Sequence, residues 1–109
     1  MTLRPPRASS SSTMSRLLAL DYEIAREQAT ALGRLGRALE AALAALAEHD
    51  RSHRDRSAAR TRLVQDASYA LWCFVIQREA CGLRDARPVL RDYRVPAEVY
   101  NRMGVLGRP

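Results

Sequence analysis

Apolar and small residues recur along the first half of the chain at alternating steps of four and three residues. This spacing is the heptad pattern of a helix that packs lengthwise against other helices. Charged residues fall between these positions, as expected for a solvated outer face. Nine positions follow the pattern, and we call them the seam: Leu18, Tyr22, Ala25, Ala29, Leu32, Gly36, Leu39, Leu43 and Leu46. The seam predicts one continuous helix, about 50 Å long at 1.5 Å per residue, from a cap at Ser15 to about Glu48.

A second helix is predicted after the polar stretch HDRSHRDRS, which reads as a turn. Asp55 or Ser57 would cap it, and Gly82 would end it after Cys81. This helix is apolar on two faces, and such a helix must be covered on two sides. One face carries Leu63, Ala67, Ala70, Phe74 and Cys81, and the other carries Tyr69, Trp72, Ile76 and Ala80.

The C-terminal residues predict two short helices. Asp85 would cap the first, with Pro88 in its first turn, and Pro96 would begin the second. Their inward residues would be Val89, Leu90, Tyr93, Val99, Tyr100 and Met103, with Gly104 as the stop. No segment alternates as a strand does. We therefore predict an all-α fold, a long helical hairpin whose two short C-terminal helices pack on the second helix, over Trp72 and Ile76.

The two ends of the chain lie outside the predicted domain. The N-terminal segment MTLRPPRASSSSTMSR is rich in Ser, Pro and Arg and is followed by the first acid, Asp21. We expect disorder over residues 1–14, one helical domain over 15–104 and a tail over 105–109, with Met14 as an alternative start. The longest apolar run is Tyr69 to Ile76, far short of the roughly 18 residues that span a bilayer. We therefore expect no membrane association and a cytoplasmic protein.

The charged residues give weak evidence about partners. The net charge is +6, and every basic residue except the two histidines is an arginine, so lysine chemistry such as a Schiff base is excluded. Five arginines lie near the predicted turn: Arg51, Arg54, Arg56, Arg60 and Arg62. They could bind an anionic partner, although a solvated turn explains them more simply.

The residues that carry most protein chemistry are not arranged for it. Cys73 and Cys81 lie eight residues apart on one helix, about 12 Å between Cα atoms, too far for a disulfide. We interpret both as packing residues. His49 and His53 have helical metal-ligand spacing, but a turn separates them and arginines surround them. No nucleophile, base and orienting group come together, so we predict no catalytic residue, no metal, no cofactor and no enzymatic activity.

Two segments leave nucleic-acid binding open as an alternative. LGRLGRAL, residues 32–39, resembles the GXXG loop of KH domains, but no strands follow, and close helix packing at Gly36 explains the glycine better. Residues 86–103 can be aligned with a helix-turn-helix whose turn is Arg94 to Pro96. Leu90 and Arg94 stand where that motif usually has alanine and glycine. The alternative function is thus a nucleic-acid-binding regulator using residues 86–103 or the arginine-rich turn 51–62.

LDYEIAREQATALGRLGRALEAAL and FVIQREACGLRDARPVLRDYRVPAEVYNRMG resemble a family of short bacterial proteins of unknown function. The resemblance implies a cytoplasmic, all-helical protein and transfers no functional residue. The first predicted helix is about ten residues longer than the second, so part of the seam needs other cover. We therefore favour a small non-enzymatic interaction or scaffold module, a coiled-coil homodimer or the partner of another helical protein.

Overall fold

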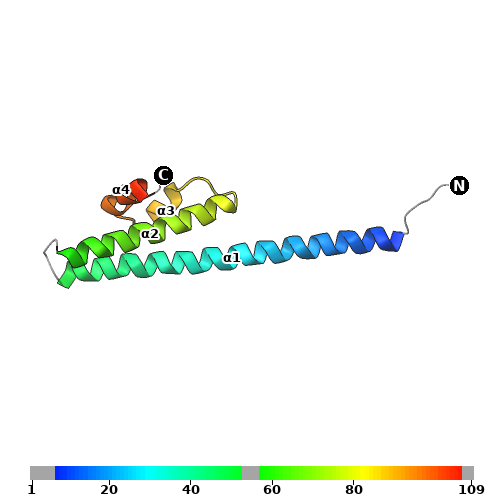
Figure 1. The fold of residues 1–109 in the computed structure, drawn as a ribbon, viewed down its shortest axis with the longest axis horizontal. Helices are drawn as coiled ribbons and strands as arrows, with labels where there is room; N and C mark the ends of the chain where they lie inside the picture. The colour runs from blue at the N-terminus through cyan, green and yellow to red at the C-terminus, as the bar shows by residue number, and fades with distance from the viewer. Residues whose placement is uncertain (1–6, 53–56, 107–109) are drawn as a thin grey trace. The chain divides into compact units, whose positions relative to one another are not determined.

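The structure, a computed structural model, describes residues 7–52 and 57–106, with side chains described over 11–52 and 57–104. The described residues form four α-helices and no strand (Figure 1), which confirms the predicted all-α fold. The helices are α1 (Arg7–Ser52), α2 (Ala58–Ala80), α3 (Arg87–Asp92) and α4 (Ala97–Leu106). The chain divides between Thr30 and Ala31 into two compact units. The first holds the N-terminal part of α1, and the second holds the rest of α1 with the three other helices.

The first helix begins earlier than the sequence predicts. It starts at Arg7 rather than at Ser15, so the disorder expected for residues 1–14 is corrected for residues 7–14, which are helical. The physical reason is that no glycine or proline follows Pro6 before Gly33, and serine at an interior position costs a helix only about 0.5 kcal/mol. Residues 1–6 lie outside the described residues. The helix ends at Ser52 and is unbroken at Gly33.

The ends of α2 match the sequence signals. Ser57 has an extended backbone (φ −71°, ψ 167°), and its hydroxyl oxygen accepts the N–H of Arg60 at 3.3 Å. This is the geometry of an N-cap. The helix ends at Ala80, and Gly82 follows with φ +87°, a left-handed conformation that favours glycine. Asp55, the other predicted cap, lies outside the described residues.

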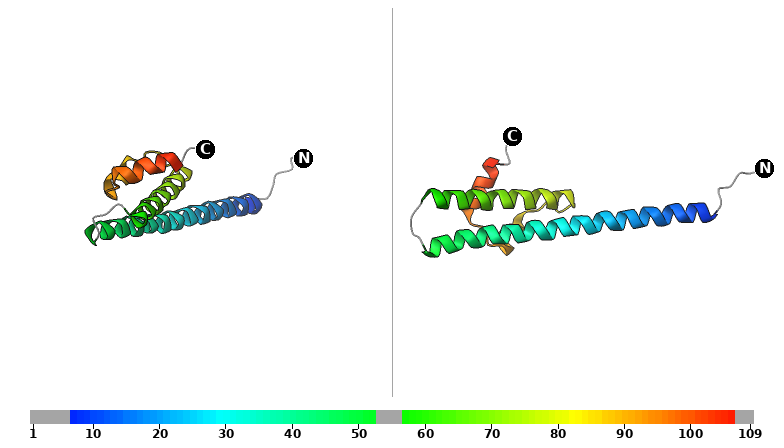
Figure 2. Two further views of the ribbon diagram at one scale, coloured as in Figure 1. Left: turned by 60° about the vertical axis from the view of Figure 1, so that its left-hand side comes forward. Right: turned by 60° about the horizontal axis from the view of Figure 1, so that its bottom comes forward.

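The hydrophobic core belongs to the second unit, where residues 31–52 of α1 run alongside α2 (Figure 2). Among the described side chains eight apolar ones are buried, and they come from all four helices: Leu39, Leu46, Val64, Ala67, Leu71, Phe74, Val89 and Val99. The fully buried Ser68 hydroxyl lies 2.7 Å from the Val64 carbonyl oxygen and 3.0 Å from that of Val99. Its proton is thus shared between α2 and α4, which fixes α4 on α2.

The C-terminal helices cover a different face of α2 from the one predicted. Ile76 is 46% exposed and Tyr69 is 60% exposed, while Trp72 is half-buried. Val89 and Val99 reach the face of α2 that carries Leu71, so the face of Tyr69 and Ile76 is left to solvent.

Details of the two short helices also differ from expectation. Ala86, not Asp85, is the N-cap of α3, although Asp85 Oδ1 accepts the N–H of Arg87 at 3.0 Å. Gly104 does not stop α4, which continues to Leu106. Val99 is buried and Met103 is half-buried as predicted, whereas Tyr100, expected to point inward, is exposed. Both short helices nevertheless exist at the predicted places.

Candidate interaction surface

The first unit carries large apolar side chains that are exposed to water. Six of them lie within eleven residues of α1, and each is between 46% and 68% exposed. We call them the α1 patch: Met14, Leu17, Leu18, Leu20, Tyr22 and Ile24. Every side chain from residue 11 to residue 27 is exposed. Exposed apolar surface of this extent marks interaction sites in water-soluble proteins.

The structure divides the nine seam residues between the two units. In the second unit Gly36, Leu39 and Leu46 are buried, and Leu32 and Leu43 are half-buried against the core. In the first unit the other four are exposed: Leu18, Tyr22, Ala25 and Ala29. The same heptad spacing therefore serves an internal core over one stretch and remains uncovered over the other.

Helical periodicity places the four exposed seam residues on one side of the first unit. At about 100° per residue they fall within an arc of about 60°. Asp21 flanks this arc on one side and Arg26 flanks it on the other, while Glu23 lies well outside it. A strip of apolar and small residues between charged flanks is the arrangement of a helix that pairs with another helix.

Sequence reasoning missed most of the α1 patch. It identified Leu18 and Tyr22 through the seam but left out Met14, Leu17, Leu20 and Ile24, which lie off the predicted seam. The available signal was the width of the apolar arc. Over residues 14–24 this arc is broader than the stripe that two apolar residues per heptad produce. A broad arc is more typical of a helix that contacts more than one neighbour.

Gly36 explains the glycine-rich segment of α1. A Cβ atom there would lie 2.8 Å from the Tyr93 hydroxyl oxygen and 3.5 Å from Phe74 Cε1. Phe74 and Tyr93 meet edge to face, with ring centroids 5.5 Å apart. Both glycines of LGRLGRAL lie inside α1, and the described residues contain no strand, so the segment is not a KH-type loop. Gly36 is a place where aromatic rings approach a helix backbone.

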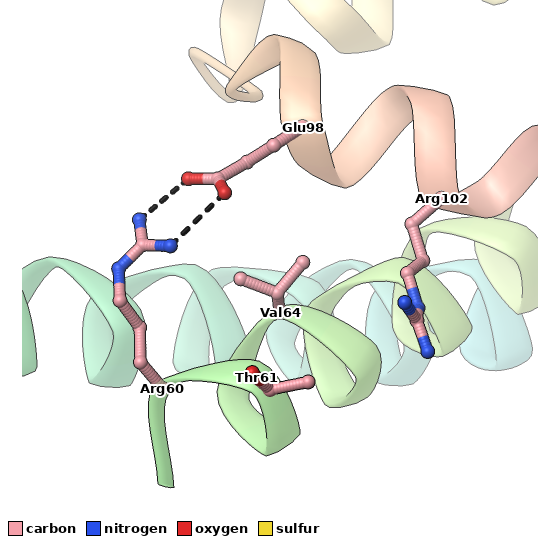
Figure 3. A pocket seen from close by; sticks show the side chains of 5 residues that line it. All are labelled: Arg60, Thr61, Val64, Glu98 and Arg102. Atoms are coloured by element: carbon pink, nitrogen blue, oxygen red, sulfur yellow. Dashed lines mark hydrogen bonds and ion pairs between the residues drawn. The ribbon is translucent and has the colours of Figure 1, made fainter. Parts of the chain in front are cut away.

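Arg60 joins three helices of the second unit. Its Nε lies 2.8 Å from Asp50 Oδ1 on α1, and its Nη1 lies 3.0 Å from Glu98 Oε2 on α4. Hydrogen bonds with Glu98 and then Asp50 raise the pKa of the Arg60 guanidinium. Beside this pair is a shallow pocket of about 240 Å³, lined by Arg60, Thr61, Val64, Glu98 and Arg102 (Figure 3). The Arg60 guanidinium already pairs with two carboxylates, so we assign this site a structural role. We call Arg60, Asp50 and Glu98 the Arg60 clamp.

Of the five arginines that the sequence offers as a possible anion-binding cluster, the structure describes Arg51, Arg60 and Arg62. Arg60 faces the two carboxylates, and Arg51 forms an ion pair with Glu48 on its own helix. Arg62 is exposed on α2. Arg54 and Arg56, like His53, lie outside the described residues.

The cysteines are both free and half-buried. A hydrogen bond with the Cys73 thiol raises the pKa of Tyr69. Over residues 7–52 and 57–106 there is no group of three or more His, Cys, Asp or Glu side chains placed to hold a metal ion. None of the helices in that part of the chain is long and apolar enough to cross a membrane.

The turn between α3 and α4 has one feature of a helix-turn-helix. Arg94 adopts a left-handed backbone with φ +52°, at the position where that motif usually has glycine. The Val95 N–H donates to the Leu90 carbonyl at 3.0 Å and closes the turn. The electrostatics are less favourable, because Arg87 pairs with Asp85 and Arg91 pairs with Asp92.

A family model described as "Family of unknown function (DUF6665)" matches residues 9–109, so the chain belongs to that family. No curated protein and no solved structure matches it.

Proposed function

We propose that this member of the DUF6665 family is a small non-enzymatic interaction protein that forms a homodimer through the exposed part of the seam on α1, as a coiled coil. The observation that supports the proposal most directly is the exposure of the large seam side chains Leu18 and Tyr22, which are 61% and 68% exposed on the first unit. Burying such side chains is the main favourable term in association. A second copy supplies a matching apolar face, as two-fold interfaces require.

The first unit also needs stabilisation that its own residues do not supply. Every side chain from residue 11 to residue 27 is exposed, and helices without tertiary packing are marginal in water even when their propensities are favourable. A partner helix along the seam stabilises this part of α1. Ala25 and Ala29 favour such packing, because small seam residues let two helix axes approach closely.

The test is the molar mass of the full-length chain by light scattering and sedimentation over a wide range of concentration. We expect a dimer that dissociates on dilution, with loss of helicity as it does so. Leu18→Glu places a charge in the seam and should give a monomer. Thr30→Glu adds the same charge outside the seam and should leave the dimer intact. A wild-type monomer at every concentration, with constant helicity, would overturn the proposal.

A second candidate function is DNA binding by α3 and α4, and the left-handed conformation of Arg94 is the observation that favours it. Asn101 and Arg102 are exposed on α4, where a recognition helix would present base-reading side chains. The test is binding of mixed-sequence duplex DNA at low salt. This candidate predicts salt-sensitive binding that Arg102→Glu weakens. No binding at low salt would remove it.

The proposal includes a cytoplasmic location. It predicts that the protein remains in the soluble fraction of the native cells after membranes are sedimented. Recovery with the membranes would contradict this part of the proposal.

A further inference from the structure

The exposed part of the seam is flanked by two opposite charges. Whether each charge meets an opposite charge on a second helix depends on the direction in which that helix runs. Asp21 lies on one side of it, and Arg26 lies on the other side, five residues later. Both side chains are exposed. Neither forms an ion pair within the described residues, and a separation of five residues does not bring them together on one helix.

In a parallel, in-register pair of helices, a residue at a g position on one flank of the seam contacts a residue of the partner helix. That residue is the one at the e position, five residues later in the sequence and on the opposite flank. With Leu18 and Ala25 at d positions and Tyr22 at an a position, Asp21 is a g residue and Arg26 is an e residue. Asp21 of one copy therefore meets Arg26 of the second copy. Two-fold symmetry makes this contact twice.

An antiparallel pair gives no such match. If Leu18 lies opposite Ala29 and Tyr22 lies opposite Ala25, flanking positions pair g with g and e with e. Asp21 then faces Gln28, and Arg26 faces Ala19. Both charges would lie beside the interface without an opposite charge across it. Charge complementarity thus distinguishes the two directions.

We infer that two copies associate with their α1 helices parallel and in register, with reciprocal Asp21–Arg26 ion pairs on both sides of a seam formed by Leu18, Tyr22, Ala25 and Ala29. The inference rests on the proposed homodimer and names its direction and register. The charges select the direction, and the apolar seam supplies most of the affinity. Because the pairs are exposed, added salt weakens the preference.

Charge reversal tests the register in the full-length protein. Asp21→Arg places like charges opposite each other twice, and Arg26→Asp does the same. Each change should raise the dimer dissociation constant roughly tenfold. The double variant Asp21→Arg/Arg26→Asp restores opposite charges and should recover most of the wild-type affinity. Glu23→Arg, a matched change outside the seam and its flanks, should leave the dissociation constant within about threefold of wild type.

Disulfide cross-linking tests the relative direction of the two α1 helices independently of the dimer affinity. Under mild oxidation Leu18→Cys should form a disulfide between its own copies, because equivalent seam positions meet only in a parallel, in-register dimer. The parent protein, which keeps Cys73 and Cys81, gives the background. Cross-linking only when Leu18→Cys is mixed with Ala29→Cys would show an antiparallel dimer. That result, or single charge reversals without effect, overturns the inference and leaves the homodimer standing, whereas a wild-type monomer overturns both.

Discussion

Gly36 on α1 and Tyr93 at the end of α3 lie so close that the glycine has no room for a side chain. A Cβ atom at position 36 would approach the Tyr93 hydroxyl oxygen to 2.8 Å, closer than Cβ atoms approach other heavy atoms. At Gly33, one turn earlier, the nearest atom to such a Cβ is the flexible guanidinium end of Arg37, at 3.2 Å. The two glycines of one motif therefore have different roles.

Gly36→Ala should destabilise the fold by about 1–2 kcal/mol, because the strain of overpacking exceeds the gain in helix propensity. Gly33→Ala is the matched control, since it makes the same change three residues away. There the propensity gain should dominate and raise the free energy of unfolding by up to about 1 kcal/mol. Urea denaturation monitored by circular dichroism measures both.

The cause of the Gly36 effect can be separated from general helix disruption. In the double variant Gly36→Ala/Tyr93→Phe the hydroxyl is absent, and most of the loss due to the alanine should be recovered. If the cost of Gly36→Ala is the same with and without the Tyr93→Phe substitution, the hydroxyl contact is not responsible.

Much of this fold follows from local sequence signals. The heptad spacing predicts one long α1, Ser57 and Gly82 mark the ends of α2, and Pro88 lies in the first turn of α3. These signals act through backbone geometry and hydrogen bonds within a few residues. They need no knowledge of what packs against the helix.

Local sequence signals could not predict the features of the fold that depend on contacts between distant residues. The apolar side chains of Leu71 and Ile76 look equivalent in sequence, yet only Leu71 is buried, because it packs in the core formed by all four helices and Ile76 does not. The clamp between Arg60 and Glu98 spans 38 residues. At the candidate surface, the heptad pattern identified Leu18 and Tyr22, but spacing alone could not tell which part of the seam the chain itself covers.

The two faces of α2 should respond differently to truncation. Leu71→Ala removes a fully buried side chain from the core and should cost about 2–5 kcal/mol in the free energy of unfolding. Ile76→Ala removes a side chain that is 46% exposed and should cost less than about 1.5 kcal/mol. Thermal and chemical denaturation of the pair give the comparison. Equal losses would show that Ile76 is covered in solution.

The Arg60 clamp should make a small, salt-dependent contribution to stability. Arg60→Met keeps much of the aliphatic packing but removes both ion pairs, and should lower the free energy of unfolding only slightly. The loss is small because Asp50 and Glu98 are 45% and 41% exposed and are screened by water. Arg62→Met, at an exposed position on the same helix, should be nearly neutral. A loss at Arg60 that high salt does not reduce would point to packing rather than charge.

Lowering the pH should weaken the hydrogen bonds at the N-terminus of α3, because it protonates the Asp85 carboxylate. Hydrogen bonds from the Arg87 side chain and backbone hold the pKa of Asp85 below its usual value of about 4. Because the folded pKa is depressed, the stabilisation is complete above the unfolded pKa and is lost as the pH falls through the folded one. Asp85→Asn should therefore lower stability at neutral pH and flatten its dependence on pH below about 4. Denaturation midpoints of wild type and variant, measured from neutral to acidic pH, should converge at the acid end; a constant difference across the range would mean that the Asp85 charge does not contribute.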